Sequence, residues 1–417
     1  MGSSSISSVP KLVPLSKQEE EGKKMRRIAK LYTRNLNKFS FSKEDKLQRE
    51  TVLLQLPYQM KESGSRGVDN VVIFPYGTFY HGLGYSDDPL TAFICIGHLI
   101  PEKKAKSSEF AEEMEDGEVM TEEFLTRSVE SDNRMRQALL LEVNDALISK
   151  ENNFQRFYKQ VTLTRQGRLY FVYEPSHNPT ATPVECILEA KSFLQVQVSR
   201  LIKFYCHLED IFWIFSQSVL HWARSHDVIQ RLGKNDVDGL TQDHIILLII
   251  FYLVRHKVIP SLALLQNWTC TPFYVDGINT GFCDDVDFIK KKFKGKVSTA
   301  KSSEPSLQRV LQHLHLFFSE ISSLNFLDYG ISPATGAAFA KSTFNGTKNN
   351  NLQRRLDTKT ALCIQHIFDS CQNTTRKVGE AWITKLQSKA RTAALKMTPS
   401  IWRKHIVKAT NIFFATS

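Results

Sequence analysis

The fold of this chain is decided by the stretch Phe74-Pro-Tyr-Gly-Thr-Phe-Tyr-His-Gly-Leu-Gly-Tyr-Ser-Asp-Asp-Pro-Leu-Thr-Ala-Phe-Ile-Cys-Ile96. The pattern predicts the end of a strand, a tight turn at Gly77, a short helix, a loop and a second apolar strand over residues 92–96. A Gly77-Thr78 pair that opens a helix can offer backbone N–H groups and a hydroxyl to a phosphate. The alternative interpretation of the same pair is a tight turn without a ligand.

Composition sets the broad class. The chain has 417 residues, of which 42% are hydrophobic and 23% charged, which is typical of a globular protein with about two domains. A net charge of +11 favours a polyanionic partner, RNA above all. The seven cysteines are scattered without metal spacing, which indicates a reducing compartment and no structural zinc. The longest apolar run, residues 245–254, is too short for a bilayer and predicts a buried helix, and no secretory signal is present.

The order of patterns predicts two domains of different type. Residues 1–22 are polar and predicted to be disordered, and residues 401–417 form a C-terminal tail. Residues 23–190 predict an α/β domain with N-terminal helices, including a hairpin about Gln166-Gly167 and a last core strand over 184–188. Residues 191–400 predict a helical domain, with helices over 211–226, 241–256, 307–322 and 381–397.

Several motifs in this order resemble one family. The 74–96 stretch resembles the Gly-Ser-x-x-x-Gly-(loop)-Asp-x-Asp signature of the poly(A) polymerase and terminal uridylyltransferase family, which are nucleotidyltransferases. Residues 218–226 are similar to its Val-[Lys/Arg]-x-Trp-Ala-[Lys/Arg] helix, residues 258–262 to its Leu-Pro-x-Leu turn, and residues 363–373 to its closing Ile-x-[Asp/Asn]-Pro-Phe element. The resemblance spans roughly residues 65–400, and the mitochondrial poly(A) polymerases are the most similar members.

The resemblance implies a fold and a chemistry. The fold is α+β: a small mixed-sheet nucleotidyltransferase domain with helices, followed by a helical poly(A)-polymerase-associated domain. The family adds nucleotides to RNA 3′ ends with two Mg²⁺ ions, which require hard oxygen ligands. The family's three metal-binding carboxylates fall on Pro89, Thr91 and Ile187, none of which carries a carboxylate. We therefore expect no catalytic residues and no metal site.

The nucleotide pocket also departs from the family pattern. The family's triphosphate-binding basic residue falls on Leu220, and its base-stacking aromatic falls on Asp243, which would repel a triphosphate. Only Gly77 and Thr78 keep a nucleotide-binding character. Shifted carboxylates could compensate, since Asp87 and Asp88 precede the first metal position and Glu185 and Glu189 flank the third on the same strand face.

Two functional hypotheses follow. The first is a catalytically inactive relative that acts by binding RNA or a protein partner, or as a homo-oligomer, with no cofactor and no membrane association. The alternative is a divergent active enzyme that adds A or U to RNA 3′ ends with Mg²⁺ or Mn²⁺ held by relocated carboxylates. A helical scaffold unrelated to the family is a third interpretation. The resemblance implies a mitochondrial location, and otherwise we expect a cytoplasmic one. The residues expected to contact RNA are Lys23, Lys24, Arg26, Arg27, the lysines of 290–296, Lys385, Lys389, Arg391 and Lys396.

Overall fold

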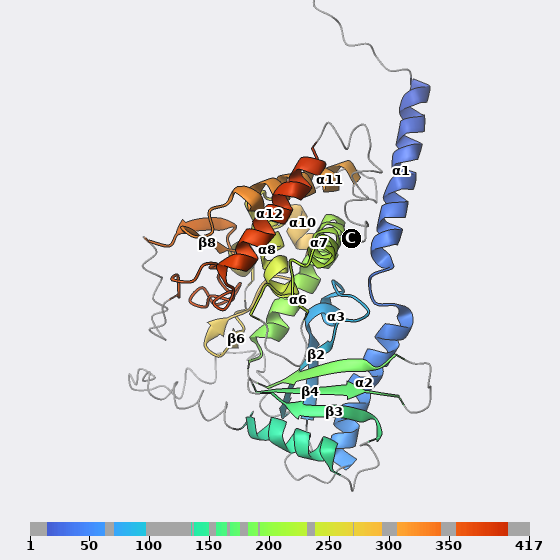
Figure 1. Cartoon of the computed structure of the whole chain (residues 1–417), viewed down its shortest axis with the longest axis vertical. Helices are drawn as coiled ribbons and strands as arrows, with labels where there is room; N and C mark the ends of the chain where they lie inside the picture. The colour runs from blue at the N-terminus through green and yellow to red at the C-terminus, as the bar shows by residue number, and fades with distance from the viewer. Residues whose placement is uncertain are drawn as a thin grey trace, which may run out of the picture.

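The computed structural model describes residues 15–62, 71–96, 135, 137–149, 156–164, 167–175, 182–190, 192–231, 238–269, 271–293, 307–342 and 356–398. They form a mixed five-stranded sheet and a larger helical body that stands on one end of it (Figure 1). The predicted C-terminal tail lies outside the described residues. Among the described helices, none combines the length and the apolar character needed to cross a bilayer.

The strands that the sequence predicts form one sheet. Its strands are β1 (Val71–Tyr76), β2 (Leu90–Ile96), β3 (Tyr158–Leu163), β4 (Arg168–Tyr173) and β5 (Val184–Glu189). The spatial order is β1-β2-β5-β4-β3, and only the β2–β5 pair is parallel. The short helix α3 (Gly77–His81) joins β1 to the loop before β2, so the strand, turn, helix and strand of the opening stretch are confirmed.

The two faces of the sheet serve different purposes. On β5, Val184, Cys186 and Leu188 point into a core that also takes in helix α2 (Lys43–Glu62) and the helical residues 137–148. Because strand side chains alternate, residues 185, 187 and 189 lie on the opposite face, toward the helical body. This period of two decides which side chains can reach a site between the two parts.

The helical body has one continuous apolar core. Helix α8 is its centre, because every residue from 245 to 254 is buried, and this confirms the predicted buried helix. Trp222 from α7 and Phe318 from α11 pack with their ring centroids 4.5 Å apart. The helices are α6 (Leu194–Leu208), α7 (Asp210–Ser225), α8 (Gln242–Arg255), α9 (Leu262–Asn267), α10 (Val286–Lys292), α11 (Leu307–Ser323) and α12 (Glu380–Lys396), with hairpins β6 (Tyr274–Val275) and β7 (Ile278–Asn279), and β8 (Tyr329–Ser332) and β9 (Ala337–Ala340).

The N-terminal helix corrects one prediction. Helix α1 (Leu15–Asn37) takes in residues 15–22, which the sequence analysis assigned to a disordered N-terminus; residues 1–14 lie outside the described part of the chain. Tyr32 and Leu36 of α1 are buried in the core of the helical body, and the Tyr32 hydroxyl shares a 2.6 Å hydrogen bond with Ser218 Oγ on α7. In Figure 1, α1 accordingly runs beside the helical body while α2 lies against the sheet. The N-terminal segment therefore packs first against the helical body, through α1, and then against the sheet, through α2.

Candidate functional site

A cleft of about 260 Å³ lies where the sheet meets the helical body. It is lined by the end of β1, the α3 turn, the loop before β2 and the start of β2, the start of β4, the end of β5, the end of α7 with the loop after it, and the beginnings of α6 and α8. The family's nucleotide site is expected at this place. The lining residues are Tyr76, Gly77, Thr78, Asp88, Pro89, Thr91, Arg168, Glu189, Gln195, Arg224, Asp227, Ile229, Gln230, Arg231, Gln242 and Asp243.

The three expected metal positions lie together but do not form a ligand set. Strand pairing aligns Thr91 with Tyr76 on one side and with Ile187 on the other. Pro89 and Thr91 line the cleft, whereas Ile187 is 1% exposed and packs with Tyr170 and Val172. A proline, a hydroxyl and a buried alkyl group supply no carboxylate oxygen. Within the described part of the chain, no cluster of three or more Asp, Glu, His or Cys side chains could hold a metal ion. The donor set therefore does not fit Mg²⁺.

The Gly77-Thr78 turn keeps its shape and has other partners. Gly77 has φ +70°, and a Cβ there would lie 2.6 Å from Thr91 Oγ1, so glycine is required at this position. The Gly77 N–H donates to Ser199 Oγ on α6 at 2.8 Å, and the Thr91 hydroxyl donates to the Tyr76 carbonyl, also at 2.8 Å. The Gly77 amide, one of the groups that could meet a phosphate, is therefore already bonded within the protein.

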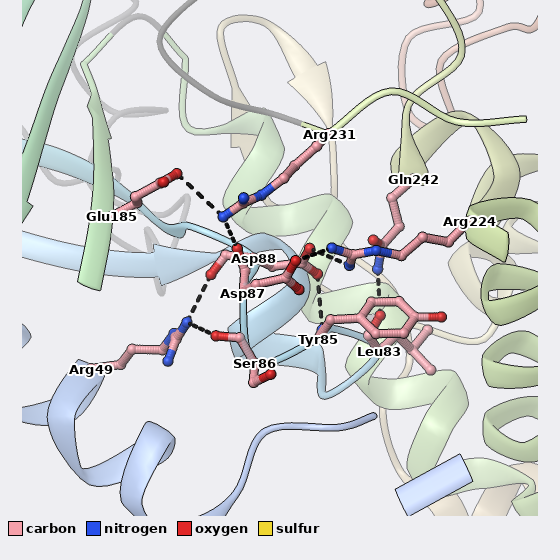
Figure 2. Close-up of polar contacts among 10 residues, drawn as sticks. All are labelled: Arg49, Leu83, Tyr85, Ser86, Asp87, Asp88, Glu185, Arg224, Arg231 and Gln242. Carbon is pink, nitrogen blue, oxygen red and sulfur yellow. Dashed lines mark hydrogen bonds and ion pairs between the residues drawn. The ribbon is translucent and has the colours of Figure 1, made fainter. Parts of the chain in front are cut away.

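Arginines hold the loop between α3 and β2 from three directions (Figure 2). Arg224 of α7 binds both carboxylates of the loop, at 3.1 Å to Asp88 Oδ1 and in a shorter contact with Asp87. Arg231 donates to the Asp87 carbonyl and forms an ion pair of 3.4 Å with Glu185 of β5. These contacts connect the helical body to the sheet domain across the cleft.

The loop is also held from behind and from within. Arg49 of α2 donates to the carbonyls of Ser86 and Asp88 at 2.7 and 2.8 Å. Asp88 Oδ2 accepts from the Tyr85 N–H at 2.9 Å, and the residue is 6% exposed. Burial raises the pKa of the Asp88 carboxyl above its ordinary value, while the Tyr85 N–H and Arg224 oppose this rise. Asp88 is therefore committed to holding the loop.

A second charged group occupies the sheet side of the cleft. Arg168 and Glu189 face each other on β4 and β5 and form an ion pair. Asp243, in the first turn of α8, lies near them, but Arg168 makes its ion pair with Glu189. Burial raises the pKa of Asp243 to about 6; the negative charge of Glu189 adds to the rise, and Arg168 opposes it. The surroundings of Asp243 therefore resist its ionisation.

The structure places some of the predicted site residues in the cleft and others outside it. Gly77, Thr78, Pro89, Thr91 and Asp243 line the cleft. Ile187 does not, and Leu220 is fully buried in the helical core. The expected shared face of Glu185, Ile187 and Glu189 is confirmed by the alternation of β5, but each of the two glutamates is paired with an arginine. Sequence reasoning gave no role in the site to Arg168, Arg224 or Arg231, although Arg224 stands at the last basic position of the 218–226 motif.

A signal for one of them was present in the sequence. Arg224 lies one helical turn after Leu220, so it was available on the same helix face as the position that the family pattern pointed to. Arg168 and Arg231 stand in a hairpin and in a loop, where no periodicity marks them.

The substitution Asp243→Asn is expected to stabilise the protein by about 1–2 kcal/mol at pH 7.5, since two pKa units correspond to about 3 kcal/mol at most. The sign follows from a folded-state pKa above the ordinary value of 3.8: ionisation of Asp243 opposes folding. The penalty is absent below about pH 4 and complete above about pH 6. Urea unfolding across this range should show the variant's advantage growing as the pH rises.

A matched control is available in the same cleft. Asp227 is exposed and has φ +52°, a conformation that asparagine tolerates. Asp227→Asn should change the stability by less than about 0.5 kcal/mol. If both variants behave alike at every pH, the cleft does not resist the ionisation of Asp243.

Comparisons with known proteins identify solved structures that have a similar fold. No protein-family model matches the chain, and no curated protein sequence matches it. Among solved structures, mitochondrial poly(A) polymerase in complex with ATPγS has a TM-score of 0.66 at 17% identity, covering 93% of this chain and 72% of that chain. A cytoplasmic RNA terminal U-transferase has a TM-score of 0.62 at 13% identity, with 93% and 98% covered. The Cid1 poly(U) polymerase bound to MgATP has a TM-score of 0.61 at 13% identity over the same shares. The chain therefore has the fold of the poly(A) polymerase and terminal uridylyltransferase nucleotidyltransferases, as its motifs predicted.

Proposed function

We propose that this protein is a catalytically inactive relative of RNA 3′-end nucleotidyltransferases that acts by binding RNA. One observation carries the loss of catalysis: the carboxylates close to the expected metal positions, Asp88, Glu185 and Glu189, are each bound by an arginine. An arginine places positive charge where the family's mechanism needs two divalent cations. The proposal therefore includes no resident metal.

The alternative, an active enzyme with relocated carboxylates, requires changes at these same pairs. Asp88 would have to leave Arg224 and the Tyr85 N–H, and Glu185 would have to leave Arg231. Breaking a buried charge pair costs about 3–5 kcal/mol, which metal binding would have to offset for Asp88. The alternative predicts that Asp88→Ala or Glu185→Ala abolishes nucleotide addition.

The deciding experiment is an extension assay. Purified full-length protein, incubated with labelled RNA primer, each NTP and either Mg²⁺ or Mn²⁺, is expected to add no nucleotide above a heat-inactivated control. Losing metal-ion stabilisation of the transition state removes many factors of ten in rate, and about 1.4 kcal/mol corresponds to each factor. Template-independent extension that Asp88→Ala or Glu185→Ala abolishes would establish the alternative instead.

The RNA-binding part of the proposal is supported by helix α12. Its exposed face carries Lys389, Arg391 and Lys396, and the half-buried Lys385 lies over the Trp382 ring at 5.3 Å. The helix holds one carboxylate, Glu380, in its first turn. A solvated basic surface of this kind can neutralise RNA phosphates, and the chain's net charge of +11 acts in the same direction.

The other predicted basic runs differ in their surroundings. On α1, Arg26 and Arg27 are exposed. On α10, Lys290, Lys291 and Lys292 follow Asp284, Asp285 and Asp287, so acidic residues balance this run. The α10 run therefore serves as a matched control for α12.

We expect the double substitution Lys389→Ala/Lys396→Ala to weaken binding to any single-stranded RNA and to lower the salt slope of log K by about 1.4, which is about 0.7 per lost phosphate contact. Fluorescence anisotropy between low and physiological salt measures both effects. Lys290→Ala/Lys291→Ala should leave the slope within about 0.5 of the parent. An RNA complex that is indifferent to salt and to the α12 variant would contradict RNA binding by this face, and a salt-insensitive complex with a protein would favour the partner role.

The proposed compartment is the mitochondrion. It is supported by the likeness in fold to mitochondrial poly(A) polymerase. Fractionation of cells that express the tagged full-length protein tests it.

A further inference from the structure

The cleft has the opposite charge to the rest of the chain. Its lining contains three arginines and four carboxylates, and the arginines also bind Asp87 and Glu185, which adds two more negative charges. The whole chain carries +11. A nucleotide triphosphate would therefore meet net negative charge in the cleft, and the arginines that could receive it are already engaged by carboxylates.

Two carboxylates of the lining, the exposed Asp227 and the half-buried Asp243, are left without a charge partner among the described residues in this arrangement, and Asp243 is the more enclosed of the two. Asp88 is bonded to Arg224 and to the Tyr85 N–H, and Glu189 to Arg168. Asp243 lines the same cleft and makes no hydrogen bond or ion pair within the described part of the chain. A half-buried carboxylate without a partner costs free energy. Such a group is retained at a cost to stability, which is typical of residues that serve a ligand.

The dimensions suit a small group. About 260 Å³ lies just below the roughly 300–1,000 Å³ of pockets that hold drug-sized molecules. The walls are mixed, since Ile229 and Pro89 are apolar while Thr78, Gln195 and Gln230 are polar. An alkyl chain that ends in one charged group matches walls of this composition.

We propose that the cleft binds a cationic group, a guanidinium or an ammonium on an alkyl chain, with Asp243 as its charge partner. This assignment goes beyond the loss of catalysis and beyond RNA binding, and it depends on neither. Asp243 gains the ion pair that it lacks in the protein alone, and the excess negative charge of the cleft is reduced. The same chemistry could arrive as a free small amine or as an arginine or lysine side chain of a protein partner.

Calorimetric titration of the full-length protein with n-butylguanidinium tests the proposal, with n-butylurea as a neutral ligand of nearly the same shape. The guanidinium is expected to bind and the urea to bind at least about tenfold more weakly, which is about 1.4 kcal/mol. Asp243→Asn should weaken guanidinium binding at least about tenfold, whereas Asp227→Asn should change it less than about threefold. The Asp243 variant is expected to be more stable than the parent, so loss of binding will not reflect misfolding.

Two further titrations ask whether the cationic group belongs to a partner protein or to a free amine, and whether the cleft still prefers a nucleotide. The peptide acetyl-Ala-Arg-Ala-amide binding at least as well as n-butylguanidinium assigns the group to a partner's side chain, and the reverse order assigns it to a free amine. ATP with Mg²⁺ is expected to bind more weakly than either. The proposal is overturned if ATP binds more tightly than the guanidinium, if Asp243→Asn binds as the parent does, or if neither cation binds at millimolar concentration. None of these results alters the extension assay, so the two proposals fail separately.

Discussion

The substitution Ile187→Asp is expected to destabilise the protein by about 4 kcal/mol at pH 7, although it returns a carboxylate to the family's third metal position. Ile187 is 1% exposed and packs with Tyr170 and Val172, away from the cleft lining. A new carboxylate there loses these apolar contacts and places a charge at a buried position. Because protonation removes the charge, the deficit should shrink as the pH falls toward 4. Urea unfolding at several pH values measures it.

The control is Ile187→Val, which removes one methylene and should cost about 1 kcal/mol at every pH. The opposite outcome would be informative. A deficit below about 1 kcal/mol for the aspartate, together with a rise in melting temperature on adding Mg²⁺, would mean that the position still communicates with the cleft. The third metal position would then lack a metal-binding side chain but would remain accessible from the cleft.

Local patterns predicted the fold well because they depend on near neighbours. Gly77 is required by its positive φ and by its close contact with Thr91. A glycine between a strand and a short helix predicts such a turn. The period of two along β5 is enough to place residues 185, 187 and 189 on one face. The ten buried residues of α8 were visible as an apolar run.

The charge pairs of the site could not be predicted in the same way. Arg224 and Asp88 are separated by 136 residues, and Arg168 meets Glu189 only because β4 pairs with β5 in one register. The motif match also pointed to Leu220, which the packing of α7 places in the core. Identifying missing carboxylates needs only the sequence, but finding that arginines now occupy their surroundings needs the tertiary structure.

Substituting Arg224 by alanine is expected to cost about 3 kcal/mol at pH 7, since it leaves the buried carboxyl of Asp88 without its cation. Arg224 is itself 28% exposed on its side chain, which places the cost at the lower end for buried pairs. The substitution also removes the contact of the guanidinium with the Tyr85 ring, 4.4 Å away. Thermal or urea unfolding of the full-length variant gives the value.

The pH dependence distinguishes this prediction from a simple loss of packing. Burial already raises the pKa of Asp88, and removing Arg224 raises it further, so the variant's deficit should decrease as Asp88 becomes protonated on acidification. Arg200→Ala is the control, because its ion pair with Asp284 is exposed on both sides and is worth less than about 1 kcal/mol. Arg224→Lys should fall between the two, since it keeps the charge but cannot reach Asp87 and Asp88 with a planar fork. If Arg224→Ala and Arg200→Ala cost the same at every pH, then the arginines do not hold the cleft, and the carboxylates near the metal positions are free to act.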